Sequence, residues 1–257
     1  MSETPLLHQE HQGVLTLTFN RPEKYNALTF EMLEELRELL VRFREEDELR
    51  VMLITAKGKY YSAGMDISAG LAPETESGIE FRRWYRTAIH QIFDEIEAIE
   101  KPIVSAIQGP CLGGALEMAL SCDFRLAAAS AKFGLPETNI GALPGSGGTS
   151  RLTRLVGAAE AKWLIMAAQT ISAERALRTG LVHEIYPNES FQEDCQTFAR
   201  HLTSLPREVL GAAKLTIELC QDLDRASARN IERLANTPLS QSREHLELVN
   251  AFMKDRK

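Results

Sequence analysis

Apolar residues in the first half of the chain occur either in short runs or at helical spacing. Three short segments are rich in β-branched and apolar residues: VLTLTF (residues 14–19), VMLIT (residues 51–55) and PIVSAIQ (residues 102–108). All three are predicted to be buried strands. Between the first two, residues 31–46 are predicted to form a helix that Thr29 caps. Its apolar positions fall on one face: Met32, Leu33, Leu36, Leu39, Leu40 and Phe43.

Helical spacing dominates the rest of the chain. A long helix is predicted at residues 78–100 and a short one at residues 113–121, followed by a strand at residues 124–128. Strand–helix units followed by a helical tail predict an α/β fold with a helical C-terminal part. The helices expected in that part cover residues 158–168, 173–178, 190–202, 207–220 and 243–253.

The length and charge of the chain narrow its class. With 257 residues the chain can bury a large core, and its net charge of −7 disfavours nucleic acid as a partner. The N-terminus does not resemble a signal or transit peptide, and no uncharged apolar run approaches the roughly 18–20 residues that span a bilayer. We therefore expect a cytoplasmic protein with no membrane partner.

Cysteine and histidine usage predicts neither a disulfide framework nor a metal site. The four cysteines form no C-x-x-C pair and stand in apolar or helical contexts, so we expect reduced thiols in the core. His8 and His11 are three residues apart without further ligands, which indicates a surface or strand position rather than metal binding.

One charged residue stands in an otherwise apolar helix. From Cys111 to Ala119 only Glu117 is charged. A helix that is apolar on all sides is usually buried, and a buried carboxylate needs a partner or a shifted pKa, as general acid–base catalysis also does. The alternative is a glutamate placed one turn into the helix to interact with the helix dipole. Taken alone, the segment favours neither interpretation.

Glycines precede this helix and occur in two other loops. Gly113-Gly114 could expose free N–H groups to a developing oxyanion, or only allow close packing. Ser62-Ala63-Gly64 follows a predicted strand, where α/β folds often bind ligands, although Asp66 alone is typical of a turn. Glu137 lies in a long loop rich in glycine and proline, and a single glutamate there is more often a surface residue.

Together these segments resemble the crotonase (enoyl-CoA hydratase/isomerase) family over nearly the whole chain. The segments that carry the resemblance occur in the family's order, which makes it specific. They are NRPEKYNAL (20–28), SAGMDI (62–67), LGGALEMALSCD (112–123), FGLPE (133–137), LPGSGGT (143–149), ALRTGLV (176–182) and AFMKDRK (251–257).

The resemblance implies a fold and an assembly. We expect a crotonase-like spiral of ββα units in residues 1–190, which would hold the acyl-CoA and catalytic site. Residues 191–257 would form a helical region for oligomer packing and site closure. Such chains assemble as homotrimers or homohexamers, with an acyl-CoA as substrate. No cofactor is implied, because coenzyme A is part of the substrate.

The resemblance also implies roles for individual residues. The backbone N–H groups of Met65 and Gly114 would form an oxyanion hole for the thioester carbonyl, and Glu117 and Glu137 would be the catalytic pair. Met65 is larger than the alanine often found there, but only its N–H is used. Seven residues are expected to line the substrate or its CoA moiety: Lys24, Ala27, Ala63, Gly64, Asp66, Ile67 and Gly113.

The expected reaction is reversible hydration of a 2-enoyl-CoA, because both glutamates are present. Relatives that isomerise commonly replace one of them. Isomerisation of a 3-enoyl-CoA, or dehydration of a specialised 3-hydroxyacyl-CoA, remains the alternative, and a non-catalytic RNA-binding role is a more distant one. At the C-terminus the chain has Glu247-Leu248 where the family often has Glu-Gly, which could alter the acyl pocket or a subunit contact.

Overall fold

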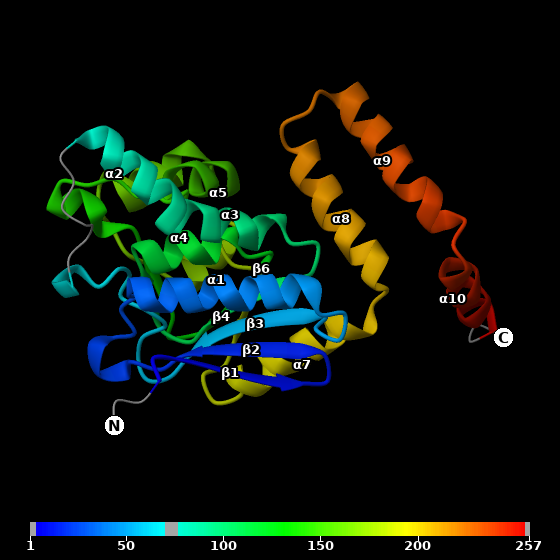
Figure 1. Cartoon of the computed structure of the whole chain (residues 1–257), viewed down its shortest axis with the longest axis horizontal. Coiled ribbons are helices and arrows are strands. Elements are labelled where there is room, and N and C mark those ends of the chain that lie inside the picture. Colours follow the sequence, from blue (N-terminus) through cyan, green and yellow to red (C-terminus); the bar gives the residue numbers. More distant parts are fainter. Residues whose placement is uncertain (1–3, 70–76, 255–257) are drawn as a thin grey trace.

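The computed structural model describes residues 4–69 and 77–254, and its centre is a six-stranded sheet (Figure 1). The strands lie in the order β1-β2-β3-β4-β6-β9, antiparallel between β1 and β2 and parallel elsewhere. They are β1 (Leu6–His11), β2 (Val14–Phe19), β3 (Val51–Ala56), β4 (Ile103–Ile107), β6 (Phe124–Ala128) and β9 (Glu184–Tyr186). A smaller sheet contains β5 (Pro110–Leu112), β7 (Lys132–Gly134) and β8 (Ile171–Ser172).

Helices surround both sheets and form the C-terminal part of the chain. The α-helices are α1 (Phe30–Glu45), α2 (Gly78–Tyr85), α3 (Gln91–Ala98), α4 (Gly114–Ser121), α5 (Gly148–Ile165), α6 (Ala173–Arg178), α7 (Phe191–Ser204), α8 (Arg207–Cys220), α9 (Arg225–Ser240) and α10 (Arg243–Lys254). Short turns of 3-10 helix are η1 (Pro22–Lys24), η2 (Ile67–Ala69) and η4 (Pro136–Ile140), and a π-helical turn, η3 (Arg86–His90), joins α2 to α3.

The large sheet is buried on both faces, as a mostly parallel sheet requires. Helices α1, α3 and α4 contribute to the core on one face. Helix α7 covers the other, where Phe191 and Cys195 pack with Val51, Leu53 and Val104. The apolar segments at 14–19, 51–55 and 102–108 are strands, as predicted, and the α/β fold with C-terminal helices is confirmed.

The prediction for α1 is also confirmed. The Thr29 hydroxyl accepts a hydrogen bond from the Met32 N–H at 3.3 Å, which satisfies one of the free amides at the start of the helix. The predicted apolar face is buried at all six positions: Met32, Leu33, Leu36, Leu39, Leu40 and Phe43.

Helices α5 and α9 differ from the sequence prediction. Helix α5 begins at Gly148, ten residues before the predicted start at 158, because Gly157 (φ +77°) breaks the helix and hides the continuity of its two halves. Helix α9 was not predicted, although Ile231, Leu234 and Leu239 recur at helical spacing; it buries no residue and contains Pro238. The Asp224 carboxylate caps α9 by accepting hydrogen bonds from the N–H groups of Ala226 (2.9 Å) and Ser227 (3.2 Å).

Other differences concern short strands and turns. The prediction omitted β1, whose six residues pair with β2 and contain both His8 and His11, so these histidines do occupy a strand. The helix predicted at 78–100 forms, but η3 interrupts it with one π-helical turn. Three of the four cysteines are buried free thiols, and Cys220 is half-buried. No helix in the described ranges is long and apolar enough to cross a bilayer.

The C-terminal helices form an arm along one side of the body. In Figure 1, α8 runs beside the body, whereas α9 and α10 lie farther from it. The Lys214 ammonium of α8 donates to the Asp123 carboxylate and to the Ile96 carbonyl, each at 3.0 Å. Helix α7 follows residue 190 but still packs on the sheet, and the arm begins only at α8. The domain division at residue 190 therefore stays a prediction.

We expect Lys214→Met to destabilise the protein by about 3 kcal/mol. Its ammonium and the Asp123 carboxylate are largely buried, and removing one member of a buried ion pair leaves the other charge uncompensated. Urea unfolding of Lys214→Met measures the loss. Arg243→Met is the control, because the Arg243–Glu247 pair is exposed and contributes less than about 1 kcal/mol. Equal stability of the two variants would contradict this role for Lys214.

Candidate active site

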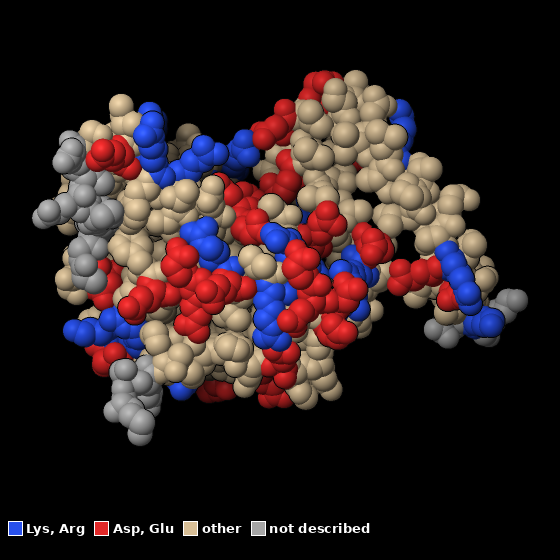
Figure 2. Space-filling model, in the orientation of Figure 1, with Lys and Arg blue, Asp and Glu red and all other residues tan. Residues whose placement is uncertain are grey.

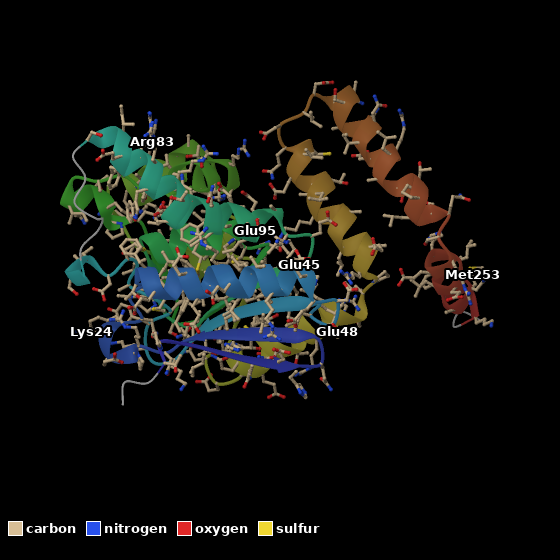
Figure 3. All side chains as sticks on the ribbon, in the orientation of Figure 1. Lys24, Glu45, Glu48, Arg83, Glu95 and Met253 are labelled. Carbon is tan, nitrogen blue, oxygen red and sulfur yellow. The ribbon has the colours of Figure 1, made fainter. Side chains whose placement is uncertain are left out.

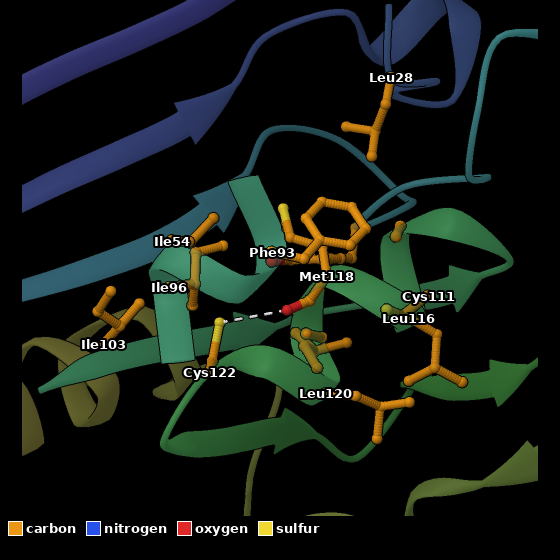
Figure 4. Close-up of a cluster of buried hydrophobic side chains, with 14 of the residues drawn as sticks. Leu28, Ile54, Phe93, Ile96, Ile103, Cys111, Leu116, Met118, Leu120 and Cys122 are labelled. Atoms are coloured by element: carbon orange, nitrogen blue, oxygen red, sulfur yellow. Dashed lines mark hydrogen bonds between the residues drawn. The ribbon is translucent and has the colours of Figure 1, made fainter. Parts of the chain in front are cut away.

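Helix α4 lies inside the core with every residue buried. Leu116, Met118 and Leu120 project into the hydrophobic cluster of Figure 4, where Phe93 and Ile96 of α3 also lie. Glu117 is the only charged residue of the helix. The prediction that this segment is a helix apolar on all sides is confirmed, and the carboxylate of Glu117 needs partners inside the protein.

Two backbone amides from the start of α5 bind the Glu117 carboxylate. Its Oε1 accepts hydrogen bonds from the N–H of Ser146 at 2.7 Å and of Gly148 at 3.0 Å, and the residue is only 4% exposed. A Cβ added to Gly148 would lie 2.7 Å from both Glu117 Oε1 and Pro144 Cβ. Glycine at this position therefore allows the backbone to approach the carboxylate.

Burial raises the pKa of Glu117 to about 7. The nearby Glu137 carboxylate also raises this pKa, whereas the N–H groups of Gly148 and Ser146 and the charge of Arg151 lower it. The result is a carboxyl group that can take up and release a proton near neutral pH.

Glu137 lies across from the glycine pair. A Cβ added to Gly113 (φ +54°) would lie 3.2 Å from Glu137 Oε1. Its Oε2 is buried without a hydrogen-bond partner in the described part of the chain, and burial raises its pKa as well. Glu137 is thus not the surface residue that its loop alone favoured: its carboxyl group lies beside Gly113 and close enough to Glu117 to raise the pKa of that residue.

The amides of Met65 and Gly114 lie close together beside these glutamates. The Gly64 carbonyl accepts from Leu28 N–H, and Asp66 N–H donates to the Leu28 carbonyl, both at 2.8 Å. These bonds leave the Met65 N–H without an acceptor among the described residues. Gly114 is the first residue of α4, where an N–H has no partner within the helix.

Gly64 makes this approach possible. Its φ is +95°, and an added Cβ would lie 2.8 Å from the Leu112 carbonyl oxygen and 3.2 Å from Gly114 N. A Cβ added to Gly114 would lie 3.7 Å from Met65 N. The two loops are joined by a bridge between Ser62 and Cys111, so the amide pair is held by backbone on both sides.

The residues predicted to contact CoA form one connected rim. Ala27 N–H donates to the Lys24 carbonyl at 3.0 Å, and Ala63 N–H donates to the Tyr25 carbonyl at 2.9 Å. Ile67 is exposed, and Lys24 is exposed with its label at the edge of the body in Figure 3. This rim is therefore open to solvent on its outer side.

Asp66 belongs to the rim through its backbone only. Its carboxylate accepts from the Ser68 hydroxyl at 2.6 Å and pairs with Arg21 at 3.0 Å. The Ser68 hydroxyl, followed by Arg21, holds the pKa of Asp66 below its usual range against the effect of partial burial. The interpretation of Asp66 as a turn-forming residue is confirmed for its side chain.

Sequence reasoning gave no individual role to four residues around Glu117: Tyr85, Ser146, Gly148 and Arg151. The Tyr85 hydroxyl is 2.6 Å from the Ser146 hydroxyl, and the pKa of Tyr85 is raised by burial and by both glutamates. Arg151 follows the two amides that bind Glu117. The LPGSGGT motif drew attention to the loop, but the late start predicted for α5 concealed that Ser146 and Gly148 stand at a helix N-terminus.

The acyl end of the site is only partly described. The acyl pocket is expected to draw on apolar residues of the 71–92 region and the C-terminal helices, and residues 71–76 of that region lie outside the described residues. Within residues 4–69 and 77–254, no group of three or more His, Cys, Asp or Glu side chains is arranged to hold a metal ion.

Comparison with known proteins gives one consistent result. Residues 9–257 match the sequence model of the enoyl-CoA hydratase/isomerase family. The chain is 34% identical to a short-chain-enoyl-CoA hydratase of Clostridium acetobutylicum, with 96% of this chain and 94% of the relative covered. It is 32% identical to a 1,2-epoxyphenylacetyl-CoA isomerase of Escherichia coli, covering 100% and 97%. A crystal structure of an enoyl-CoA hydratase from Bacillus anthracis superimposes with a TM-score of 0.90 at 32% identity, covering 98% and 97%.

Proposed function

Because the chain belongs to the crotonase (enoyl-CoA hydratase/isomerase) family, we propose that it adds water reversibly across the 2,3 double bond of a 2-enoyl-CoA thioester. The family membership makes it an enzyme that acts on acyl-CoA thioesters. The observation that carries the hydration proposal is the pair Glu117 and Glu137, two carboxyl groups with raised pKa values beside one amide pair. Relatives at similar identity include both a hydratase and an isomerase, so the reaction itself needs testing.

In the proposed mechanism, the N–H groups of Met65 and Gly114 donate hydrogen bonds to the thioester oxygen. Addition of water to C3 moves negative charge onto this oxygen as an enolate-like transition state forms. Donors fixed in advance stabilise that charge without reorganisation during the reaction. The backbone bonds of Leu28 with Gly64 and Asp66 fix the first donor, and the start of α4 fixes the second.

Glu117 and Glu137 hold the reacting water between them. The water oxygen forms the new bond to C3, one carboxylate takes up the proton that the water loses, and the other carboxyl group gives a proton to C2. The protein returns to its starting charge in each turnover. Which glutamate has which role is left open, because burial raises both pKa values and the Glu137 carboxylate also raises that of Glu117.

The rim of the site would bind the CoA moiety. In this proposal Ala27, Ala63, Gly64 and Gly113 allow the pantetheine to run close to the backbone, and the backbone of Asp66 and Ile67 faces the adenine end. Lys24, together with the basic turn Lys57-Gly-Lys59, would attract the phosphates.

Surface charge argues against nucleic acid as the ligand. Figure 2 shows acidic side chains gathered over the face that contains α1, with arginines among them. Several of these arginines are paired: Arg37 with Glu34, Arg42 with Glu10 and Glu46, and Arg44 with Glu95. The carboxylates of this face repel a phosphate backbone, and guanidinium groups already paired with carboxylates offer it little attraction.

The C-terminal arm supports assembly into a homotrimer or homohexamer. Several large apolar side chains of the arm are exposed, among them Leu234, Leu246, Phe252 and Met253, the last of which is labelled in Figure 3. Contiguous apolar surface of this kind is typical of a subunit interface. Sedimentation of the purified chain measures the assembly state.

A substrate panel followed by ultraviolet absorbance tests the proposed reaction. Loss of the conjugated thioester absorbance with crotonyl-CoA supports hydration. A gain of that absorbance with a 3-enoyl-CoA, without loss from crotonyl-CoA, would assign isomerisation instead. Absence of turnover with every enoyl-CoA and 3-hydroxyacyl-CoA, together with sub-micromolar binding of RNA at physiological salt, would overturn an enzymatic role.

We expect Glu117→Gln to be more stable than the wild type at pH 8 but not at pH 4. Folding raises the Glu117 pKa from 4.5 to about 7, so the folded state holds its proton to higher pH than the unfolded state. Wild-type stability therefore falls as pH rises from about 4.5 to 7, by roughly 3 kcal/mol from this group. The glutamine side chain is neutral at both pH values and keeps an oxygen that can accept from both N–H groups. The variant therefore does not lose this stability as the pH rises. Urea unfolding of the variant and the wild type at pH 4 and pH 8 measures their free energies of unfolding. The same difference between the two proteins at both pH values would contradict the raised pKa.

A further inference from the structure

The segment that binds Glu117 is itself held by an arginine. Arg151 Nη1 donates to the Ser146 carbonyl at 3.4 Å, and its backbone N–H donates to the Gly147 carbonyl at 2.8 Å. Gly147 has φ +96°, and a Cβ added there would overlap Arg151 Nη1. The guanidinium thus packs against residues 146–148, the same residues whose amides bind the Glu117 carboxylate.

Helix α3 fixes the guanidinium from the other side. Arg151 Nη2 donates to Asp94 and to Glu97, each at 2.7 Å, and its Nε lies 3.2 Å from Glu97 Oε2. A planar guanidinium bound in this forked way has little freedom to rotate. The Arg151 side chain is only 13% exposed, whereas its partners Asp94 and Glu97 are 66% and 36% exposed, so the guanidinium is enclosed and the carboxylates face the surface.

From these contacts we propose that Arg151 is a positioning residue for the reaction: it holds the amides of Ser146 and Gly148 against Glu117 and places a positive charge beside this segment. The inference rests on the proposed function, because it assumes that Glu117 takes part in proton transfer. Arg151 itself does not touch the substrate.

Titratable groups from four elements lie around Glu117 and Arg151. Glu137 faces Glu117 from η4, and Tyr85 from α2 contacts the Ser146 hydroxyl. His90 of η3 packs on the Tyr85 ring with centroids 4.6 Å apart. From α3 come Asp94 and Glu97, both paired with Arg151. Burial and Glu137 favour the protonated form of Glu117, whereas the N–H groups of Gly148 and Ser146, and then the charge of Arg151, oppose them.

The pH profile of the hydratase reaction separates positioning from general support of the fold. Arg151→Met removes the charge, and we expect the limb of the profile that Glu117 controls to move to higher pH by roughly 0.5–1 unit, with kcat at pH 7 reduced about tenfold. Arg151→Lys keeps the charge but loses the forked geometry, so we expect kcat to fall while the limb stays near its wild-type position.

Arg154→Met is the matched control. Arg154 lies one turn along the same helix, is exposed and pairs only with Asp222 among its ion-pair partners in the described chain, so neither limb should move. If Arg151→Met and Arg151→Lys lower kcat equally and neither moves a limb more than Arg154→Met does, Arg151 is structural and the inference is wrong.

Glu117→Gln, assayed in parallel, distinguishes this failure from failure of the proposed function. An active Glu117→Gln enzyme would remove the assumption that Glu117 transfers a proton. An inactive Glu117→Gln enzyme combined with an unmoved limb in Arg151→Met overturns only the role of Arg151.

Discussion

Glu117→Gln is expected to lower kcat for hydration of crotonyl-CoA by about 10²–10⁴, the usual contribution of one positioned acid or base. The glutamine has the same shape, and its oxygen can still accept the N–H groups of Ser146 and Gly148. What it loses is the exchangeable proton on a carboxyl group whose pKa is about 7. Initial rates with KM determined separately measure the effect, and Glu137→Gln should behave in the same way.

Glu218→Gln is the control for this experiment. Glu218 lies in α8, and burial raises its pKa too, but it is outside the site. We expect its kcat to stay within about twofold of the wild type, since it transfers no proton to substrate. Near wild-type hydration by either Glu117→Gln or Glu137→Gln would show that the two-carboxylate mechanism is wrong.

Gly64→Ala is expected to reduce kcat by about 10²–10³, comparable to the loss of one oxyanion donor. The added methyl group would lie 3.2 Å from Gly114 N and 2.8 Å from the Leu112 carbonyl, so the two loops must separate. Separation moves the Met65 and Gly114 amides away from the position of the thioester oxygen. The measurement is kcat at saturating crotonyl-CoA.

The control must reproduce the backbone strain of Gly64→Ala without touching the site. Gly180→Ala does so: Gly180 has φ +78°, and an added Cβ there meets nothing within 4 Å. Both variants lose stability because alanine disfavours positive φ, by about 1 kcal/mol for Gly180→Ala. A folded Gly64→Ala enzyme with the kcat of Gly180→Ala would exclude the amide pair as the oxyanion site.

The amino-acid pattern alone determined the elements with strong apolar periodicity. It predicted β2, β3 and β4 and the buried face of α1, because burial imposes a period that neighbouring residues display. The same pattern marked Glu117 as a charge in a fully apolar helix, and the order of the motifs indicated the family. Elements without such a pattern, such as the edge strand β1, whose last four residues are exposed, were not predicted in this way.

Local sequence could not identify the partners of these residues. Whether Glu117 interacts with its helix dipole or with a ligand was open, and the structure shows its carboxylate bound by amides 29 and 31 residues farther along the chain. Likewise, Glu137 follows a proline in a glycine-rich loop, and only the packing of η4 near Gly113 partly buries its carboxyl group. Periodicity records that a side chain is buried but not which distant residue it meets.

Arg151 shows the same division most clearly. In the sequence it is one of many arginines, and nothing in its spacing separates it from Arg154. In the folded chain one is enclosed by Asp94, Glu97 and the Ser146 carbonyl, whereas the other lies on the surface. The sequence determined that a buried carboxylate and glycine loops are present; the packing of α3, α4 and α5 decided which charges surround that carboxylate, because electrostatic interactions depend on distance in space and not along the chain.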